Sequence, residues 1–294
     1  MLTILPSFYP RFVCRADRCG HSCCRGWEID IDELTAERYL SWPGGLGEAL
    51  RANMRENDGV WSFRLTADER CPFLRADNLC RLIREAGEEA LCDICTMHPR
   101  FFVLAADEEN ELGGLGLCCE EACALLLAEE RELSFYIEDS GEGLSFGEIL
   151  AMTETELPPA AMVYDEALTK AEAEAILQEM GETEPIDEHW PEQLEAMRAR
   201  LTELLQAAQA DGSAGVTKRI PVIALQNVYR YILYRQLPLV NEAGAEAVAG
   251  YARKSVSFIR LLAALTGDWP EAVRRWSEQI EYSTENVDRL LHIL

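Results

Sequence analysis

The chain of 294 residues has little positive charge. Its 27 lysine and arginine residues stand against 52 aspartate and glutamate residues, which gives a formal net charge of −25. Phosphate backbones and anionic lipid surfaces are bound by basic faces, so this balance argues against nucleic acid and membranes as partners. Hydrophobic residues make up 48% of the sequence, which is enough for an ordinary globular core without disulfides.

The sequence also lacks a long apolar segment. No stretch approaches the ~20 uninterrupted apolar residues that a bilayer-spanning helix needs. The opening run M-L-T-I-L-P-S-F-Y-P has no basic residue and is interrupted by Pro6 and Pro10, so it does not resemble a signal peptide. We therefore predict a cytoplasmic protein. In a reducing cytosol, eleven cysteines are better suited to metal or redox sites than to disulfides.

Cysteine is absent after Cys123, so the chain divides into a cysteine-bearing part and a cysteine-free part. Soft thiolates gathered in this way suit zinc, copper or an iron–sulfur cluster. The spacing C-x4-C-x3-C-C, followed by C-x8-C, C-x2-C and C-C-x3-C, matches neither a zinc finger nor a ferredoxin, but it supplies enough thiolates for one four-ligand site. A structural zinc site and a functional centre both remain open.

Two cofactor motifs are missing from the sequence. There is no C-x3-C-x2-C loop of the radical S-adenosylmethionine type, and no G-x-G-x-x-G follows a predicted strand. Gly113, Gly114 and Gly116 form a weak cluster that we interpret as a turn rather than a cofactor loop. His98 is a candidate metal ligand because it lies within three residues of a cysteine, whereas His21 is expected to face solvent.

Hydrophobic periodicity predicts a mainly α protein of the α+β type, in which a cysteine-rich N-terminal unit with a few short strands packs on a C-terminal helix bundle. Asp32 is expected to cap a helix, and Cys71 and Cys80 to flank a turn. The predicted strands are at residues 26–32 and 60–66, at 101–106 as a buried strand, and at 111–117 as a weak strand. The predicted helices of the bundle are at about 165–180, 190–209, 221–237, 243–266 and 270–292.

The predicted domain boundaries follow the composition. Residues 1–136 form a cysteine-rich metal-cluster domain, residues 137–163 a linker or irregular wrap, and residues 164–294 the helix-bundle domain. Aromatic residues of the bundle are expected to pack in its core rather than to form a binding surface. They are Tyr229, Tyr231, Tyr234, Phe258 and Trp276.

Several runs of the sequence resemble the flagellin lysine N-methylase (FliB-like) family, and together they extend over nearly the whole chain. The first runs are P-S-F-Y-P-R-F-V-C at 6–14, C-G-H-S-C-C-R-G-W-E-I-D-I-D at 19–32 and C-P-F-L-R-A-D-N-L-C at 71–80. The others are C-T-M-H-P-R at 95–100, C-C-E-E-A at 118–122 and the closing motif I-E-Y-S-T-E-N at 280–286. The C-C pair followed by C-P-F-L, C and C-x-x-x-P is also similar to the broader YkgJ-type family, which is described as zinc- or iron-chelating.

The resemblance implies a transferase that moves methyl groups from S-adenosylmethionine to the ε-amines of lysines in flagellin or another lysine-bearing protein, with a cysteine-ligated 4Fe–4S cluster. The alternative is a non-catalytic protein that chelates zinc or iron. Cys92, Cys118 and Cys123 stand where we expect other small residues, so we treat them as extras. His98 replaces the usual tyrosine, and Glu120 replaces the usual proline. The family's cysteines correspond to Cys14, Cys19, Cys23, Cys24, Cys71, Cys80, Cys95 and Cys119.

Methylation of an amine is an in-line displacement in which the nitrogen supplies the electrons, so the substrate lysine must be neutral. Because a lysine has a pKa of about 10.4 in model peptides, the site must desolvate it or offer a base. We expect Arg100 to pair with the cofactor carboxylate, and Glu121 to orient the amine and take its proton. An ordinary ion pair is the alternative for each. Glu281 and Asn286 are expected either to reach the cleft in which Arg100 and Glu121 would act or to serve in helix packing.

Overall fold

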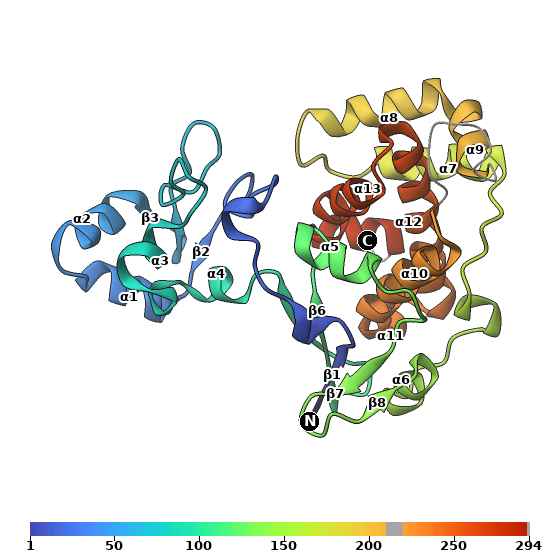
Figure 1. The fold of residues 1–294 in the computed structure, drawn as a ribbon, viewed down its shortest axis with the longest axis horizontal. Coiled ribbons are helices and arrows are strands. Elements are labelled where there is room, and N and C mark those ends of the chain that lie inside the picture. Colours follow the sequence, from blue (N-terminus) through green and yellow to red (C-terminus); the bar gives the residue numbers. More distant parts are fainter. Residues whose placement is uncertain (210–219, 293–294) are drawn as a thin grey trace. The chain divides into compact units, whose positions relative to one another are not determined.

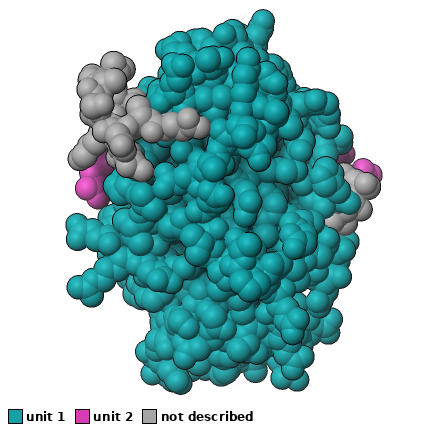
Figure 2. Space-filling model, turned by 90° about the vertical axis from the view of Figure 1, so that its right-hand side faces the viewer, with its two compact units in different colours: residues 1–13, 100–294 teal, residues 14–99 magenta. Residues whose placement is uncertain are grey.

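The computed structural model describes residues 1–209 and 220–292 (Figure 1). The chain divides into two compact units, which are coloured separately in Figure 2. Residues Cys14–Pro99 form one of them, which we call the cysteine-rich unit. Met1–Val13 and Arg100–Leu294 together form the other, which we call the sheet-and-helix unit. The cysteine-rich unit is therefore an insertion between two parts of its neighbour in sequence.

This division does not coincide with the boundary that the sequence predicts at residue 136. Residues 100–136 belong to the sheet-and-helix unit, together with the helices that follow them. They carry two strands of its sheet and one of its helices. The composition changes where the cysteines end, whereas the packing changes at residue 100.

The cysteine-rich unit combines a small antiparallel sheet with short helices. Its elements are β2 (Asp30–Ile31), α1 (Glu33–Ser41), α2 (Gly44–Asn53), β3 (Met54–Asn57), β4 (Val60–Phe63), α3 (Arg81–Ala86) and α4 (Asp93–Met97). The strands are ordered β2-β4-β3. The strand predicted at 60–66 is confirmed as β4, whereas only the end of the strand predicted at 26–32 forms, as β2. Asp32 caps α1 as expected, since its Oδ1 accepts a hydrogen bond of 2.8 Å from the Thr35 amide.

Aromatic rings fill the core of the cysteine-rich unit. Tyr39 of α1 stacks on Phe63 of β4 with 6.0 Å between the ring centroids, and Phe63 lies 5.1 Å from Phe73. The Tyr39 hydroxyl donates a hydrogen bond of 2.5 Å to the Ala90 carbonyl, so the polar end of this buried ring is satisfied. The core thus ties α1 to the strands and to the segment that precedes α4.

The sheet-and-helix unit is built on a five-stranded sheet. Its strands are β1 (Leu2–Pro6), β5 (Arg100–Leu104), β6 (Asn110–Leu115), β7 (Phe135–Ile137) and β8 (Gly143–Leu144). They are ordered β5-β6-β1-β7-β8, so that β1, which the sequence analysis did not predict, lies at the centre, parallel to β6 and antiparallel to β7. The strand predicted at 101–106 forms as β5, but its predicted burial is wrong. β5 is an edge strand, and Val103 and Leu104 are exposed on it.

Glycine lets a helix side chain approach strand β6 closely. A Cβ atom on Gly114 would lie 2.5 Å from the Tyr231 hydroxyl and 2.6 Å from the Phe101 ring, closer than real Cβ contacts. Through this access, Tyr231 donates a hydrogen bond of 2.8 Å to the Leu115 carbonyl and accepts one of 2.6 Å from the Leu115 amide. The weak strand predicted at 111–117 is thus confirmed as β6, whereas the interpretation of its glycines as a turn is wrong: Gly113 and Gly114 lie in the strand and permit a helix to pack on the sheet.

Helices form most of the sheet-and-helix unit, and the fold is mainly helical as predicted. They are α5 (Glu120–Leu127), α6 (Phe146–Met152), α7 (Lys170–Gly181), α8 (His189–Ala199), α9 (Leu201–Gln209), α10 (Val222–Gln236), α11 (Val240–Ala243), α12 (Ala245–Thr266), α13 (Trp269–Trp276) and α14 (Thr284–Leu291). The long α12 packs against α9, α10 and α13 (Figure 1). The aromatic residues predicted for the core are all buried. None of the helices in the described ranges is long and apolar enough to cross a membrane.

Three segments differ from the sequence prediction: two predicted helices are each divided, and the predicted linker contains a helix. The pattern at 190–209 forms two helices, α8 and α9. The pattern at 270–292 is interrupted between α13 and α14 by a π-helical turn, Ser277–Glu281. The predicted linker at 137–163 contains α6, which begins with a capping box.

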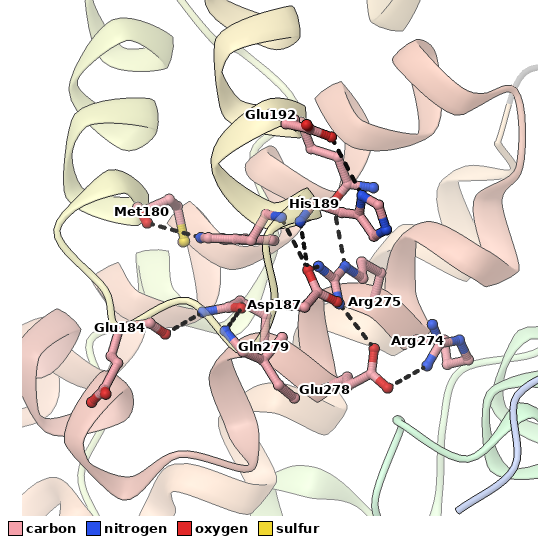
Figure 3. A network of polar contacts seen from close by, with 12 residues as sticks. Met180, Glu184, Asp187, His189, Glu192, Arg274, Arg275, Glu278 and Gln279 are labelled. Carbon is pink, nitrogen blue, oxygen red and sulfur yellow. Dashed lines mark hydrogen bonds and ion pairs between the residues drawn. The ribbon is translucent and has the colours of Figure 1, made fainter. Parts of the chain in front are cut away.

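A polar network holds the segment between α7 and α8 against α13 and the π turn (Figure 3). Arg275 is almost completely buried, and its guanidinium donates hydrogen bonds of 2.6 Å to Asp187 and 3.2 Å to Glu278. Gln279 donates one of 2.6 Å to the Glu184 carbonyl. These contacts satisfy a buried cation and fix the position of the π turn.

Candidate functional site

The backbone brings together cysteines from two distant motifs of the cysteine-rich unit. The Cys71 amide donates a hydrogen bond of 2.8 Å to the Cys24 carbonyl. Arg25 and Arg70 form an antiparallel bridge beside it. This short pairing joins the C-C-R-G segment to the C-P-F-L segment.

The C-P-F-L segment leads into the turn that the sequence predicts between Cys71 and Cys80. Leu74 and Cys80 form an antiparallel bridge across this turn. Asn78 adopts a left-handed conformation, with φ of 59°, which asparagine tolerates better than most residues. Cys80 directly precedes α3, so the turn returns its thiol to the neighbourhood of the segment that starts at Cys71.

Five thiols, which we call the thiol core, lie in or against the core of the cysteine-rich unit: Cys71 and Cys92 are buried in it, and the half-buried Cys24, Cys80 and Cys95 pack against it. Burial raises the pKa of Cys71 to about 12 and also raises the pKa of Cys80, and the charge of Cys24 adds to both shifts. A hydrogen bond between Cys92 and Cys95 lowers the pKa of the first and raises that of the second. Each thiol thus affects the ionisation of others, which shows that they are close neighbours.

The donor chemistry of this group fits a soft metal centre. All eleven cysteines are thiols rather than disulfides. Five sulfur donors in one core exceed the four that a zinc ion or an iron–sulfur cluster requires. Across residues 1–209 and 220–292, no three His, Cys, Asp or Glu side chains stand in a ligand arrangement. The five thiols are suitable donors in type and number, but their side chains are not arranged around a metal position. Metal binding would therefore have to remove their protons and reorient their side chains.

The other predicted ligands lie outside this group. Cys14 and Cys23 are exposed and Cys19 is half-buried in the cysteine-rich unit. Cys119, also a predicted ligand, belongs to the sheet-and-helix unit, where it directly precedes α5. Cys92, treated above as an extra, lies in the thiol core. Its C-x-x-C spacing is the sequence signal that could have placed it among the candidate ligands.

Arg100 and Glu121, the predicted cofactor-binding and catalytic residues, both lie half-buried in the sheet-and-helix unit. Arg100 begins β5, and its guanidinium lies 5.1 Å from the centre of the Phe12 ring and near the Tyr9 hydroxyl. Burial raises the pKa of Tyr9, and Arg100 opposes that rise. Glu121 lies in the first turn of α5, where the helix dipole favours a carboxylate.

The closing motif runs from the π turn into α14. Asn286 serves in packing, since its side chain accepts a hydrogen bond of 2.8 Å from the Glu184 amide and donates to the carbonyls of Glu184 and Gln279 at 3.0 and 2.9 Å. Glu281 is almost completely buried, and its Oε2 accepts a hydrogen bond of 2.6 Å from the Ser277 hydroxyl. The packing alternative therefore describes Asn286, whereas the buried carboxylate of Glu281 has a different environment.

Arg235 of α10 accompanies Glu281 and was not found by the sequence analysis. Its guanidinium lies 4.6 Å from the centre of the Phe101 ring and 5.7 Å from that of Tyr282, and its Nη1 lies 3.6 Å from Glu281 Oε2. Burial raises the pKa of Cys118 to about 12, while a hydrogen bond with the Tyr282 hydroxyl opposes the rise. An arginine within a helical pattern carries no sequence signal of such partners.

The chain is similar to curated proteins of Salmonella. A lysine-N-methylase of Salmonella typhimurium is 30% identical over 128 residues, which cover 42% of this chain and 31% of that protein. A lysine-N-methylase of Salmonella choleraesuis is 29% identical over the same length and share. The flagellar biosynthetic protein FliU of Salmonella muenchen is 29% identical over 128 residues, which cover 75% of it. These relatives confirm the resemblance to the FliB-like family.

The similarity concerns part of each chain. The matched residues span less than a third of the length of the two lysine-N-methylases, at 31% of each. No protein-family model matches the chain. No solved structure matches it either.

Proposed function

We propose that this chain is a protein lysine N-methyltransferase that uses S-adenosylmethionine and carries a cysteine-ligated 4Fe–4S cluster. The observation that carries the proposal is the similarity over 128 residues to proteins named lysine-N-methylase. A relative named as a flagellar biosynthetic protein supports flagellin, or another lysine-bearing protein, as the substrate. The core of five thiols supports the cluster and agrees with a reducing, cytoplasmic location.

The thiol core would hold the cluster. Cys24, Cys71, Cys80 and Cys95 combine a match to the family with a place in that core, and Cys92 adds a further sulfur donor. A 4Fe–4S cluster held there would supply Lewis-acid coordination. Cys14, Cys19, Cys23 and Cys119 stay predicted ligands from the sequence alone.

Methyl transfer requires a neutral amine aligned with the methyl group and the sulfonium sulfur. The nitrogen's electron pair forms the new C–N bond as the C–S bond breaks, its electrons return to sulfur, and the amine releases a proton. Glu121 is the sequence-based candidate for orienting the amine and accepting that proton. Arg100 is the sequence-based candidate for holding the cofactor carboxylate, because a guanidinium grips a carboxylate at two points.

A non-catalytic protein that chelates zinc or iron is the second candidate. The observation that favours it is that two of the five thiols lie in the core of a unit made of short elements and the other three pack against that core. A metal ion at such a place ties the elements together, as in structural zinc sites. This function would need no S-adenosylmethionine.

Incubation of the anaerobically purified protein with flagellin and methyl-labelled S-adenosylmethionine tests the proposal. We expect label on lysine side chains, detected by mass spectrometry of flagellin peptides, and a brown protein that contains iron and sulfide. Flagellin with acetylated lysines is the matched negative control. A colourless, zinc-containing protein that transfers no label would reject the enzyme and favour the second candidate.

A further inference from the structure

A group of buried polar side chains lies beside the closing motif in the sheet-and-helix unit. It consists of Arg235 from α10, Tyr251 and Ser255 from α12, and Glu281 from the π turn, and we call it the Arg235–Glu281 cluster. The side chain of Glu281 is 0% exposed and that of Arg235 is 16% exposed. Tyr251 and Ser255 are buried as well. Charges buried this deeply are costly unless their hydrogen-bonding capacity is used.

The hydrogen-bonding capacity of the charged pair is not used up. Glu281 Oε2 accepts from Ser277, but Oε1 has no hydrogen-bond partner within the described ranges. Arg235 Nη1 likewise has none there, because at 3.6 Å from Oε2 it is too far for a hydrogen bond. Arg235 Nη2 reaches the Glu281 carbonyl at 3.4 Å. The two side chains therefore form an ion pair through Nη1 and Oε2, in which one donor and one acceptor still lack a hydrogen bond among the described residues.

Two hydroxyls extend the cluster. Burial raises the pKa of Tyr251 well above its usual value, so its hydroxyl stays protonated and can both donate and accept. Ser255 is close enough to lower that pKa, yet neither hydroxyl makes a hydrogen bond of normal geometry in the part of the chain that the structure describes. Glu281 and Arg235 both act on the Tyr251 hydroxyl electrostatically, with opposite signs. The hydroxyl thus lies near both charges.

The π turn and two aromatic rings fix the positions of Glu281 and the Arg235 guanidinium before any ligand binds. π-helical turns are frequent at functional sites, and this one carries both Ser277 and Glu281. The rings of Phe101 and Tyr282 hold the Arg235 guanidinium by cation–π contacts, which fix the cation without neutralising it. Tyr282 is 43% exposed, so the cluster adjoins the surface of the unit at this ring.

The charges of the cluster select the class of ligand. A ligand with only an ammonium group would bring a second cation to Arg235, and one with only a carboxylate would bring a second anion to Glu281. A zwitterionic group satisfies both residues, since its carboxylate can accept from Nη1 while its ammonium group donates to Oε1. The amino-carboxylate end of an amino acid is such a group.

We infer that the Arg235–Glu281 cluster binds the amino-carboxylate end of S-adenosylmethionine, which rests on the methyltransferase function proposed above. Arg235 then takes the role that the sequence assigns to Arg100. The guanidinium of Arg100 already contacts the Phe12 ring and a tyrosine hydroxyl. Arg235, by contrast, keeps a buried donor that makes an ion pair but no hydrogen bond among residues 1–209 and 220–292.

Two ligands that differ in this end test the inference. S-adenosylhomocysteine carries the amino-carboxylate end, whereas 5′-methylthioadenosine keeps the adenosine and sulfur without it. In calorimetric titrations of the metal-loaded whole chain, Arg235→Gln and Glu281→Gln should each weaken S-adenosylhomocysteine binding by about 10- to 100-fold, the value of a charged hydrogen bond. Binding of 5′-methylthioadenosine should change by less than about twofold. Tyr251→Phe, which keeps the ring, should weaken S-adenosylhomocysteine binding by about 3- to 10-fold.

Arg253→Gln removes an exposed arginine of α12 and is the matched charge control, which should bind both ligands as the unsubstituted protein does. Equal weakening of both ligands in the cluster variants would overturn the inference, as would selective weakening in Arg100→Gln but not in Arg235→Gln. If the charged variants do not fold, unchanged binding by Tyr251→Phe overturns it. If the unsubstituted protein binds neither ligand, the proposed function fails and the inference with it. If it binds both and the cluster variants lose neither, only the inference fails.

Discussion

The two units of the chain bury reactive groups in different ways. The cysteine-rich unit gathers thiols in a small core of short elements, whereas the sheet-and-helix unit encloses charged and hydroxyl groups within a large core of helices and aromatic rings. A neutral thiol is easily buried, but it becomes a ligand only when it loses its proton. A buried charge, in contrast, must be held by the structure around it. If the first unit binds the proposed metal, its order should depend on that metal, whereas the order of the second unit should not.

Metal removal should separate the two units most strongly. Structural metal sites contribute about 10–16 kcal/mol to small metal-dependent domains, and a unit of this size has a marginal core. We expect anaerobic chelation to abolish amide-hydrogen protection in Cys14–Pro99 while α10 and α12 keep theirs, as measured by hydrogen–deuterium exchange. Unchanged protection of both units after complete metal removal would contradict this comparison.

Single cysteine substitutions should affect bound metal in the cysteine-rich unit but not in the sheet-and-helix unit. Cys71→Ser and Cys92→Ser should lose most of the bound metal, because a hydroxyl lacks the charge and softness of a thiolate. Cys123→Ser should keep it, since that thiol is buried in the other unit, where it donates a hydrogen bond of 3.2 Å to the Leu117 carbonyl. Metal analysis of the purified variants checks this prediction. The opposite pattern would show that the assigned ligands are wrong.

A packing change in the sheet should affect only the sheet-and-helix unit. Gly114→Ala should lower the free energy of unfolding by about 1–3 kcal/mol, because the new Cβ atom would overlap the Tyr231 hydroxyl. Part of this cost should vanish in a Tyr231→Phe background, where the oxygen is gone. Thermal unfolding of the four proteins in this cycle measures the difference, and metal content should stay constant. Equal costs in both backgrounds would refute the close contact.

The smallest expected effect concerns an ion pair of the sheet-and-helix unit. Burial raises the pKa of Asp187, but the hydrogen bond and the charge of Arg275 outweigh burial and hold this pKa below its usual value. A carboxyl with a depressed pKa stabilises the fold above its unfolded-state pKa of about 3.9, and this stabilisation is lost as pH falls through the folded-state pKa. Because the Asp187 side chain is 40% exposed, solvent screening limits the contribution to ~1 kcal/mol or less.

Asp187→Asn should therefore lower the thermal unfolding temperature slightly at neutral pH and flatten its decline below pH ~4. Thermal unfolding at a series of pH values measures both changes. Thr202→Ala, on the exposed side of α9, is a matched surface control. If the unfolding temperature falls as steeply below pH ~4 in Asp187→Asn as in the unsubstituted protein, Asp187 does not contribute to the acid destabilisation of the fold.

Elements with a local signal could be predicted from the sequence. Asp32 begins a helix because a short acidic side chain caps the amides that follow it, and the turn between Cys71 and Cys80 is marked by A-D-N. Strand β1 could not be predicted in the same way. It has five residues, and its register is set by a partner far along the chain, since Leu2 pairs with Asn110.

The candidate sites were predictable in composition and not in geometry. The spacing of cysteines predicts a metal site, but it does not say which thiols meet: Cys92 lies in the thiol core, and Cys119 belongs to the other unit. The π turn that buries Glu281 is invisible in the sequence because no Gly or Pro lies between residues 271 and 283. The burial of Arg235 could not be predicted either, because the groups around its guanidinium come from β5, α12 and the closing motif, which are distant in the sequence.

The insertion of the cysteine-rich unit also sets a timetable for the nascent chain on the ribosome. β1 is synthesised before that unit, yet its partners β6 and β7 are synthesised after it. At about 5–20 residues per second, roughly 2–8 s pass between the end of the unit at Pro99 and the last residue of β7. During this interval the pairing of β1 with both of its partners is incomplete, while the thiols of the cysteine-rich unit are already synthesised. The thiols of Cys14–Pro99 therefore leave the ribosome before the sheet of the other unit can be completed.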